Sequence, residues 1–426
     1  MTNHLLLSKG IQANLAQFLH LLLQILFVGI NLGTLRTVVP ALATTEFGLP
    51  ENSYMLLTLF VVAFGLVKAI LNFISGRLSE VFGRKNILIT GWLFSIPIPL
   101  LIYFGNSWNY VVAATVLLGI NQGLCWSMTQ ASKLDFVHQN ERGLAIGLNE
   151  AFGYMGLAIA GIATAQLAIM VGVRLSILLT GMAISLLALG MTIIFIEETL
   201  PWAQDKNTIE GLLVNDVNTR KPEFTTLQIL KHMSWQDKRL VAICQAGLIE
   251  KFVDALVWVL YPIMLLQKGI SLQNIGWVVG VYGIVWGLSQ PFSGWLSDRI
   301  GRHYLSIWGM WISGVGVAAM LIKNDISWYL FSAGIAGFGM AMLYPSLSAS
   351  VADLADKSWR SSAIGIYRFW RDLGYAIGAF IIGIILQLSQ SIEMAFIFVA
   401  TAMLLSGALL WYWGEETLHI KSNKLY

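Results

Sequence analysis

Long apolar runs separated by short polar stretches dominate the chain. Runs such as 86–104 and 174–196 contain few charged residues, and a helix that crosses a bilayer needs ~20 mostly apolar residues. No window alternates apolar and polar positions as membrane β-strands do. The pattern therefore predicts an all-α membrane protein. Twelve spans are expected, at residues 15–42, 54–75, 86–104, 109–131, 143–169, 174–196, 239–266, 274–295, 304–322, 327–350, 362–387 and 392–413.

One long polar stretch interrupts this pattern at residues 197–238. It carries charges of both signs, so we expect a cytoplasmic linker, with a short surface helix near 223–232. The linker divides the chain into a six-helix bundle at 1–196 and a second at 239–426. Paired bundles of this kind are usual in secondary transporters, which bind their substrate at the midplane between the halves.

Composition and charge agree with a membrane location. Hydrophobic residues make up 57% of the chain and charged residues 12%, with a mean hydropathy of +0.70; soluble domains carry about twice that charged fraction. Of the 26 basic residues, only Arg174, Lys268 and Lys323 fall in loops on one side, which is expected to be the outside. Both termini are then cytoplasmic. The net charge of +3 follows from this topology, so we expect no nucleic-acid partner.

Other chemistry is not indicated by the sequence. No Gly-x-x-x-x-Gly-Lys-Ser/Thr loop is present, so ATP is not expected to drive the protein. The six histidines show no metal-ligand spacing, and no nucleophilic catalytic set appears. Cys125 and Cys244 lie within spans and are expected to be buried thiols. We expect no cofactor, no metal, no enzymatic activity and no cleavable signal peptide.

Short blocks of sequence at the ends of the spans and between them repeat at an offset of 218 residues. The matched blocks are 76–85 and 294–303, Asp135 and Asp353, Arg142 and Arg360, 145–147 and 363–365, and 197–200 and 415–418. Five matches in one register indicate two copies of one structural unit. The positions at which the copies differ are then candidates for function.

The first matched block carries a recognisable motif in both copies. Its members are Gly76, Glu80, Gly83 and Arg84 in the first copy and Gly294, Asp298, Gly301 and Arg302 in the second. With this motif in two places, twelve spans and a central linker, the chain resembles the major facilitator superfamily over essentially its whole length. The resemblance implies two pseudo-symmetric six-helix bundles and secondary transport by alternating access.

The motif has a physical interpretation. Glycine at both ends of the block suits a sharp reversal between helices 2 and 3, and between helices 8 and 9. The carboxylates of Glu80 and Asp298 are expected to face helix N-termini or arginines, with Arg142 and Arg360 as natural partners. The resemblance implies that such contacts latch one state of the transport cycle. The alternative is a static anchor of the topology.

Within the superfamily, the segment 34–40 resembles the first-helix pattern of the twelve-helix drug:proton antiporters. The chain departs from that group at two places. Gly119 stands four residues before Gly123 where the group has an arginine, and helix 5 has no proline in 153–156. The resemblance implies a bacterial plasma membrane, and we expect a functional monomer in a lipid bilayer.

Nine ionisable residues fall within the predicted spans. Each costs roughly 2.5–3.5 kcal/mol near the centre of a bilayer, so each should face the bundle interior and have a partner or a function. Five are basic and four acidic, so nearly all can pair. They are Arg36, Lys68, Glu150, Glu250, Lys251, Asp254, Arg368, Arg371 and Asp372.

The repeat relates four of these charges. Arg36 is equivalent to Asp254, and Glu150 is equivalent to Arg368, with inverted sign in each case. Helices 1 and 7 face each other in the resembled fold, so we expect Arg36 and Asp254 to approach each other, directly or through substrate. A permanent structural pair is the alternative. Arg36 is thus a substrate-binding candidate, and Asp254 a candidate for proton coupling.

Glu150 is the first choice for proton coupling. The resemblance places helix 5 beside helix 8, at the seam between the halves, and Glu150 lies ~13 Å into helix 5 at ~1.5 Å per residue. Burial without a fixed partner favours the neutral acid, so this carboxylate could carry a proton. A carboxylate paired for packing across the seam is the alternative.

Helix 11 carries Arg368, Arg371, Asp372 and Tyr375 on one face, by their i, i+3, i+4, i+7 spacing. Lys68 on the neighbouring helix 2 is expected to pair with Asp372. Either Arg368 or Arg371 is then spare, and a spare guanidinium suits a carboxylate or phosphate of a substrate. A purely structural network is the alternative.

Polar and aromatic residues on the expected cavity helices complete the candidate site. Gln122 and Trp126 share a face of helix 4, and Trp126 is equivalent to Tyr344 in the repeat. Tyr261 lies on helix 7. Apolar side chains with a polar tip suit an amphipathic organic substrate, although packing roles are the alternative for several of them.

The sequence therefore predicts a secondary active transporter of a small organic solute, driven by an ion gradient, with proton-coupled efflux favoured. Proton-coupled uptake of an organic anion is the first alternative. A non-transporting membrane receptor or scaffold on the same fold is the second. The residues alone do not identify the solute.

Overall fold

The computed structural model describes residues 8–36, 38–39, 42–43, 46–47, 54–138, 141–203, 225–355 and 359–418. This part of the chain is almost entirely helical. The spanning segments are α1 (Leu15–Arg36), α3 (Tyr54–Phe82), α4 (Arg84–Ser95) continued by α5 (Pro97–Phe104), α6 (Trp108–Phe136), α7 (Arg142–Val171), α8 (Val173–Phe195), α12 (Lys238–Gln267), α13 (Leu272–Ile300), α14 (Arg302–Ala319), α15 (Ile326–Leu354), α16 (Arg360–Ser389) and α17 (Ile392–Trp413).

These segments correspond to the twelve predicted spans, although the first predicted span ends largely outside the described residues. Ten helices of the described part are long and apolar enough to cross a membrane by composition. The two others are α12, which carries three charges in its middle, and α14, which is only 18 residues long and begins with two polar residues. The third span bends at Ile96, where Pro97 begins α5.

The helix boundaries have local causes. Ser271 and Asp325 cap α13 and α15, since their side chains accept the backbone N–H of Asn274 and Trp328. Helices α3 and α13 end at Gly83 and Gly301, whose φ angles of +85° and +103° are rarely adopted by L side chains.

One expectation about the motif was wrong. Gly76 and Gly294 do not form part of a reversal, because each lies inside a helix, α3 and α13 respectively. The motif is helical up to residues 82 and 300, and each reversal takes place at a single glycine, Gly83 or Gly301.

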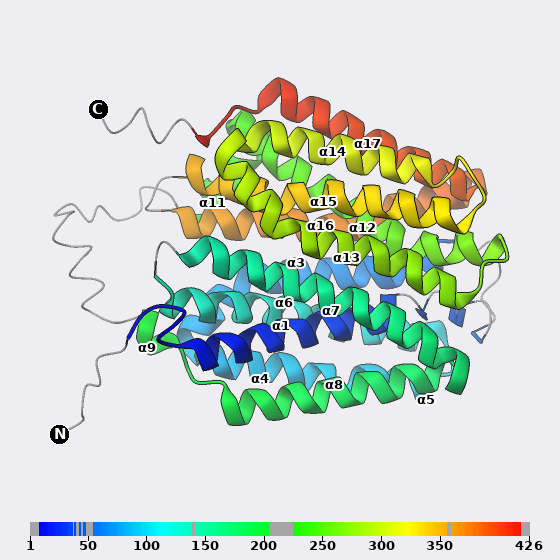
Figure 1. Ribbon diagram of the computed structural model, residues 1–426, viewed down its shortest axis with the longest axis horizontal. Helices are drawn as coiled ribbons and strands as arrows, with labels where there is room; N and C mark the ends of the chain where they lie inside the picture. Colours follow the sequence, from blue (N-terminus) through cyan, green and yellow to red (C-terminus); the bar gives the residue numbers. More distant parts are fainter. Residues whose placement is uncertain are drawn as a thin grey trace.

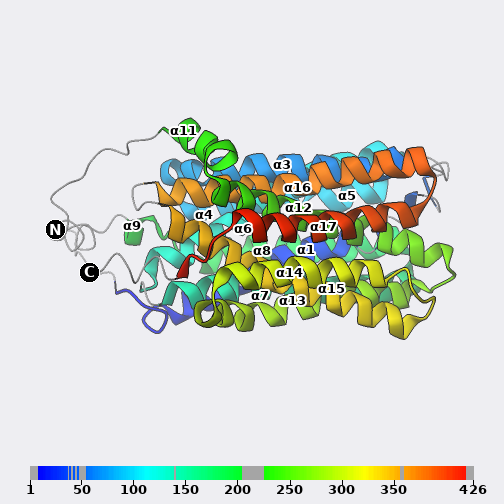
Figure 2. The ribbon, with the colours of Figure 1, turned by 90° about the horizontal axis from the view of Figure 1, so that it is seen from above.

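The helices form two bundles that lie side by side (Figure 1). Helices α1–α8 form the N-terminal half and α12–α17 the C-terminal half. The halves meet along two seams, one between α3 and α16 and the other between α7 and α13, which lie on opposite sides of the molecule (Figure 2). The short helices α9 (Leu200–Ala203) and α11 (Thr226–Lys231) lie at one end, here called the linker end. Helix α11 confirms the predicted short helix in the linker.

Both seams are tightly packed far from the linker end and loosely packed near it. A Cβ built on Gly276 would lie 2.8 Å from the Ala165 Cβ across the α7–α13 seam. A Cβ on Gly147 of α7 or Gly365 of α16, both near the linker end, would meet no atom within 4 Å. The helices of the seams are therefore packed less tightly near the linker end.

Candidate functional site

The motif residues of the N-terminal half form a compact site at the linker end. Glu198 accepts the backbone N–H groups of Arg84 (2.9 Å) and Lys85 (3.1 Å), so a carboxylate satisfies the free N–H groups at the start of α4. Asp135 at the end of α6 accepts the Arg84 Nε (3.2 Å) and the Thr199 hydroxyl (2.8 Å). Arg84 thereby ties α4, α6 and the chain after α8 together.

The C-terminal half repeats this site at the same offset. Glu416 accepts the N–H groups of Arg302 (3.0 Å) and His303 (3.1 Å) at the start of α14. Asp353 pairs with the Arg302 guanidinium and accepts the Thr417 hydroxyl at 3.3 Å. The matched sequence blocks thus assemble into one site in each half.

The electrostatics of the second site are visible at Glu416, which lies beyond α17. Partial burial acts to raise the pKa of its carboxyl group. The N–H groups of Leu418, Arg302 and His303 outweigh burial and hold the pKa below its ordinary value. The carboxylate is therefore ionised at neutral pH and serves as a fixed helix cap.

The acidic residues of the motif have other surroundings than expected. Asp298 pairs with Arg302 at 3.2 Å, one turn along, rather than with Arg360. Arg360 instead donates to the Ala355 carbonyl at 3.3 Å. Glu80 is exposed. The side chain of Arg142, which begins α7, lies outside the described part of the structure.

The interior of the molecule holds a cluster of buried charges centred on Asp254. Its carboxylate accepts Arg36 Nη2 at 2.5 Å and Lys251 Nζ at 2.7 Å. The hydroxyls of Tyr282 (3.1 Å) and Tyr375 (2.8 Å) also donate to it. Because Arg36 belongs to α1 and the other donors to the C-terminal half, the expected approach of Arg36 and Asp254 occurs directly and crosses between the halves.

Lys68 and Asp372 form the expected contact at the α3–α16 seam, with the Lys68 Nζ 3.5 Å from a carboxylate oxygen. Asn72, one turn along α3, also donates to Asp372. The Lys68 ammonium lies 5.2 Å from the centre of the Tyr375 ring and 5.4 Å from that of Trp126. These ring faces add cation–π attraction to the ion pair.

The structure distinguishes the two arginines of α16. Arg371 pairs with Glu250 of α12 and donates to the Tyr154 hydroxyl of α7 at 3.1 Å. Arg368 is partly buried, and within the described residues its guanidinium makes no hydrogen bond and no ion pair. The spare arginine of the sequence prediction is therefore Arg368.

Glu150 is buried, with 1% of its surface exposed. One carboxylate oxygen, Oε1, accepts the Trp126 indole N–H at 2.8 Å and the Asn149 amide at 3.2 Å. Both donors are neutral, and no ion pair of Glu150 is present within the described residues. It differs in this from Glu250, Asp254 and Asp372.

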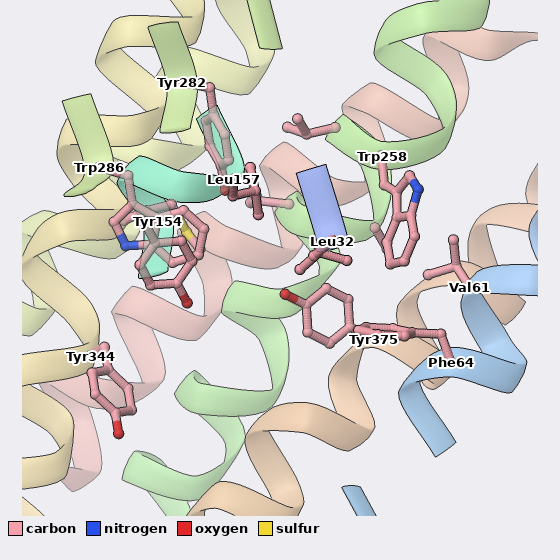
Figure 3. Close-up of a cluster of buried hydrophobic side chains, with 14 of the residues drawn as sticks. Leu32, Val61, Phe64, Tyr154, Leu157, Trp258, Tyr282, Trp286, Tyr344 and Tyr375 are labelled. Atoms are coloured by element: carbon pink, nitrogen blue, oxygen red, sulfur yellow. The ribbon is translucent and has the colours of Figure 1, made fainter. Parts of the chain in front are cut away.

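The repeat relates the two seams to each other. Lys68 and Asp372 are equivalent to Trp286 and Tyr154, each displaced by 218 residues. Those two rings stack across the α7–α13 seam with their centres 3.7 Å apart (Figure 3). One seam is thus joined by an ion pair and the other, at the equivalent positions, by an aromatic stack.

The remaining candidates lie in different surroundings. Gln122 donates to the Val28 carbonyl at 2.9 Å, and Tyr261 stacks on Phe396 with ring centres 5.5 Å apart. Both contacts stay within one half, so these two residues have packing partners. The Tyr344 ring faces the Arg371 guanidinium at 4.3 Å, beside the seam.

Sequence reasoning missed two polar groups of the interior. Lys133 is buried in α6 and donates to the Leu21 carbonyl at 3.3 Å; its position beyond the predicted fourth span removed it from consideration, although α6 continues to Phe136. The Tyr154 hydroxyl receives both Arg371 and Lys251. Its signal was available in the repeat, since Tyr154 is equivalent to the charged Asp372.

A model of the Major Facilitator Superfamily matches residues 21–250 and 243–425, which is nearly the whole chain. The chain belongs to the major facilitator superfamily. Its fold and family are those of membrane transporters, not enzymes. The predicted twelve-helix architecture is confirmed by solved structures: the D-xylose–proton symporter aligns over 95% of this chain and 98% of its own with a TM-score of 0.75 and 15% identity.

Other similar proteins cover different shares of the chain. The human organic anion transporter MFSD10 aligns over 93% of this chain and 99% of its own, with a TM-score of 0.67 and 16% identity. An uncharacterized MFS-type transporter of Salmonella typhimurium is 22% identical over 79% of this chain and 81% of its own length. Multidrug resistance protein 2 of Bacillus subtilis is 27% identical, but over only 36% of this chain and 38% of its own.

Proposed function

We propose that this transporter exports a small organic solute in exchange for protons across a bacterial plasma membrane, with both termini in the cytoplasm. The similarity to multidrug resistance protein 2 supports export. The looser packing near the linker end supports binding of the solute between the halves, which would rock against each other at the motif sites. Gly76, Glu80, Gly83, Arg84 and their equivalents would then act in gating.

The observation that carries proton coupling is the environment of Glu150. Protonation of Asp254, Asp372 or Glu250 would break an ion pair. Protonation of Glu150 breaks none, because its two hydrogen-bond donors are neutral and can still donate to the acid. The residue also lies on α7 near the seam with α13, so its charge can affect how the halves meet.

The test uses purified protein in liposomes that contain a pH-sensitive dye. When a transported solute is added outside, exchange for protons makes the lumen more alkaline, whereas co-transport makes it more acidic. We expect alkalinisation with the wild type. Glu150→Gln should lose the proton movement and keep exchange of labelled for unlabelled solute, since exchange needs no net proton transfer.

A matched control is Glu415→Gln, which removes an acid from the surface pair with Arg239 (3.5 Å) and should keep wild-type proton movement. A Glu150→Gln protein that responds fully to a pH gradient would remove Glu150 from coupling. Absence of flux for every solute tested would favour the receptor or scaffold alternative.

Uptake of an organic anion together with protons is the second candidate. The guanidinium of Arg368 favours it, because it makes no ion pair within the described residues and a guanidinium suits the charge of an anionic solute. The sign of the luminal pH change separates this candidate from export by exchange.

A further inference from the structure

The repeat places an aromatic residue beside a charged residue in both halves. Trp126 and Glu150 in the N-terminal half are equivalent to Tyr344 and Arg368 in the C-terminal half. The first pair is joined by a hydrogen bond of 2.8 Å. In the second pair, the Arg368 guanidinium donates no hydrogen bond within the described residues, and the Tyr344 ring faces Arg371 at 4.3 Å.

The guanidinium of Arg368 therefore has no carboxylate partner within the described residues. A guanidinium carries five N–H donors, and ionisable groups in spanning helices are normally paired or functional. Arg36 and Arg371 follow this rule, since both bind carboxylates. Arg368 is the exception among these three arginines.

The helix face that carries Arg368 is loosely packed toward the linker end. Gly365 precedes Arg368 by three residues and Gly147 precedes Glu150 by three, so each glycine shares a helix face with its charged residue. A Cβ on either glycine would meet no atom within 4 Å. Farther from the linker end the seam is filled, since a Cβ on Gly283 would lie 3.0 Å from Ala158.

The charge of the interior also favours an anion. Five basic residues (Arg36, Lys68, Lys251, Arg368 and Arg371) face four acidic ones (Glu150, Glu250, Asp254 and Asp372). The buried Lys133 adds another positive charge. The cluster is therefore one or two negative charges short of neutrality, and Arg368 is the arginine among them without a carboxylate partner.

We propose that Arg368 binds an anionic group of the transported solute, a carboxylate or a group of similar charge, with Tyr344 beside it. Trp126 of the other half would face the apolar part of the same solute. The carboxylate of Glu150, at the equivalent position of the other half, would compete with the solute for this guanidinium. The inference rests on the proposed transport function and adds the chemical class of the solute.

The experiment compares acids with their neutral amides on the purified full-length protein at pH 7.5. The probes are benzoate against benzamide and indole-3-acetate against indole-3-acetamide, with binding measured by calorimetry. We expect at least one acid to bind about tenfold more tightly than its amide. Arg368→Gln should remove this preference, and Arg368→Lys should keep part of it because the charge remains.

Glu150→Gln provides the matched test of competition, and it should bind the acid more tightly than the wild type. Equal binding of each acid and its amide to the wild type, including binding of neither, would overturn the proposal, as would an unchanged preference in folded Arg368→Gln. Neither result affects the liposome flux assay, so failure here is distinguishable from failure of transport.

A lipid headgroup could supply the same anionic chemistry. Repeating the series in nanodiscs of phosphatidylcholine and of phosphatidylglycerol separates the two sources. We expect the acid preference in both lipids. Its loss in phosphatidylglycerol alone would assign Arg368 to a headgroup and overturn its role in binding the solute.

Discussion

Neutralising Asp254 should open the end of the transporter that is closed in this structure. The carboxylate holds Arg36 at 2.5 Å and Lys251 at 2.7 Å, and all three side chains are buried. Asp254→Asn removes the only carboxylate that Arg36 contacts in the described part of the structure and leaves Lys251 with only Glu250, at 3.9 Å. Removing one partner of a buried ion pair lowers the stability of the folded protein by ~3–5 kcal/mol.

This loss of stability falls largely on the conformation in which α1 and α12 are in contact. Arg36 reaches Asp254 only while α1 and α12 are held together, so the penalty is relieved when the halves separate there. A bias of ~3 kcal/mol corresponds to a change of more than about 100-fold in the ratio of the two states. We therefore expect Asp254→Asn to remain folded, to populate the state open at the far end and to transport poorly.

Alkylation of a cysteine at Thr58 measures this opening. Thr58 is fully buried near the start of α3, against Gly383 of α16. With Cys125 and Cys244 replaced by alanine, Thr58→Cys should react slowly with a maleimide, and much faster when Asp254→Asn is added. Glu415→Gln is the control, because its pair with Arg239 is at the surface. A wild-type alkylation rate in the Asp254→Asn protein would refute the reasoning.

Two further predictions concern the C-terminal motif site. Glu416→Gln should lower the stability of the protein by ~1 kcal/mol at pH 7, as loss of a helix cap does. Because the pKa of Glu416 is lowered in the folded protein, its contribution is present above the ordinary value of about 4.3 and is lost as the pH falls below it. The difference in melting temperature between the variant and the wild type should therefore shrink as the pH falls below about 4.3 and vanish only below the lowered pKa of the folded protein; a constant difference would contradict this. Gly301→Ala should lower the stability of the folded protein by ~1–3 kcal/mol, and by more than Gly269→Ala. Both glycines have a positive φ, but only at Gly301 would a Cβ collide with Glu416. Equal melting temperatures of the two variants would contradict this collision.

The helices could be predicted because burial in a bilayer demands long apolar runs, and the repeat showed which charges to compare. Arg36 and Asp254 were found in this way. The same criterion failed where helices leave the apolar region. It ended the second span before the helical residues 76–82 and the fourth before Lys133, since polar residues outside a bilayer do not stop a helix.

The choice of partners could not be predicted from spacing. Arg368 and Arg371 lie on one face of α16, and the sequence left open which of them is spare. The answer depends on how α12 is rotated, since this rotation brings Glu250 to Arg371. Similarly, Asp298 pairs with Arg302 within its own half, a contact that depends on the bend at Gly301.

The unequal seams have a consequence for motion. Separation of Lys68 from Asp372 requires water or another ion to take the place of each partner, and it leaves two charges to be solvated. The stacked rings of Tyr154 and Trp286 carry no charge, and the Tyr154 hydroxyl connects them to the charged cluster only as the acceptor of Arg371 and Lys251. The two edges of the interface therefore resist separation for different reasons, the α3–α16 edge because two charges must be solvated and the α7–α13 edge because ring contacts and hydrogen bonds to Tyr154 are lost.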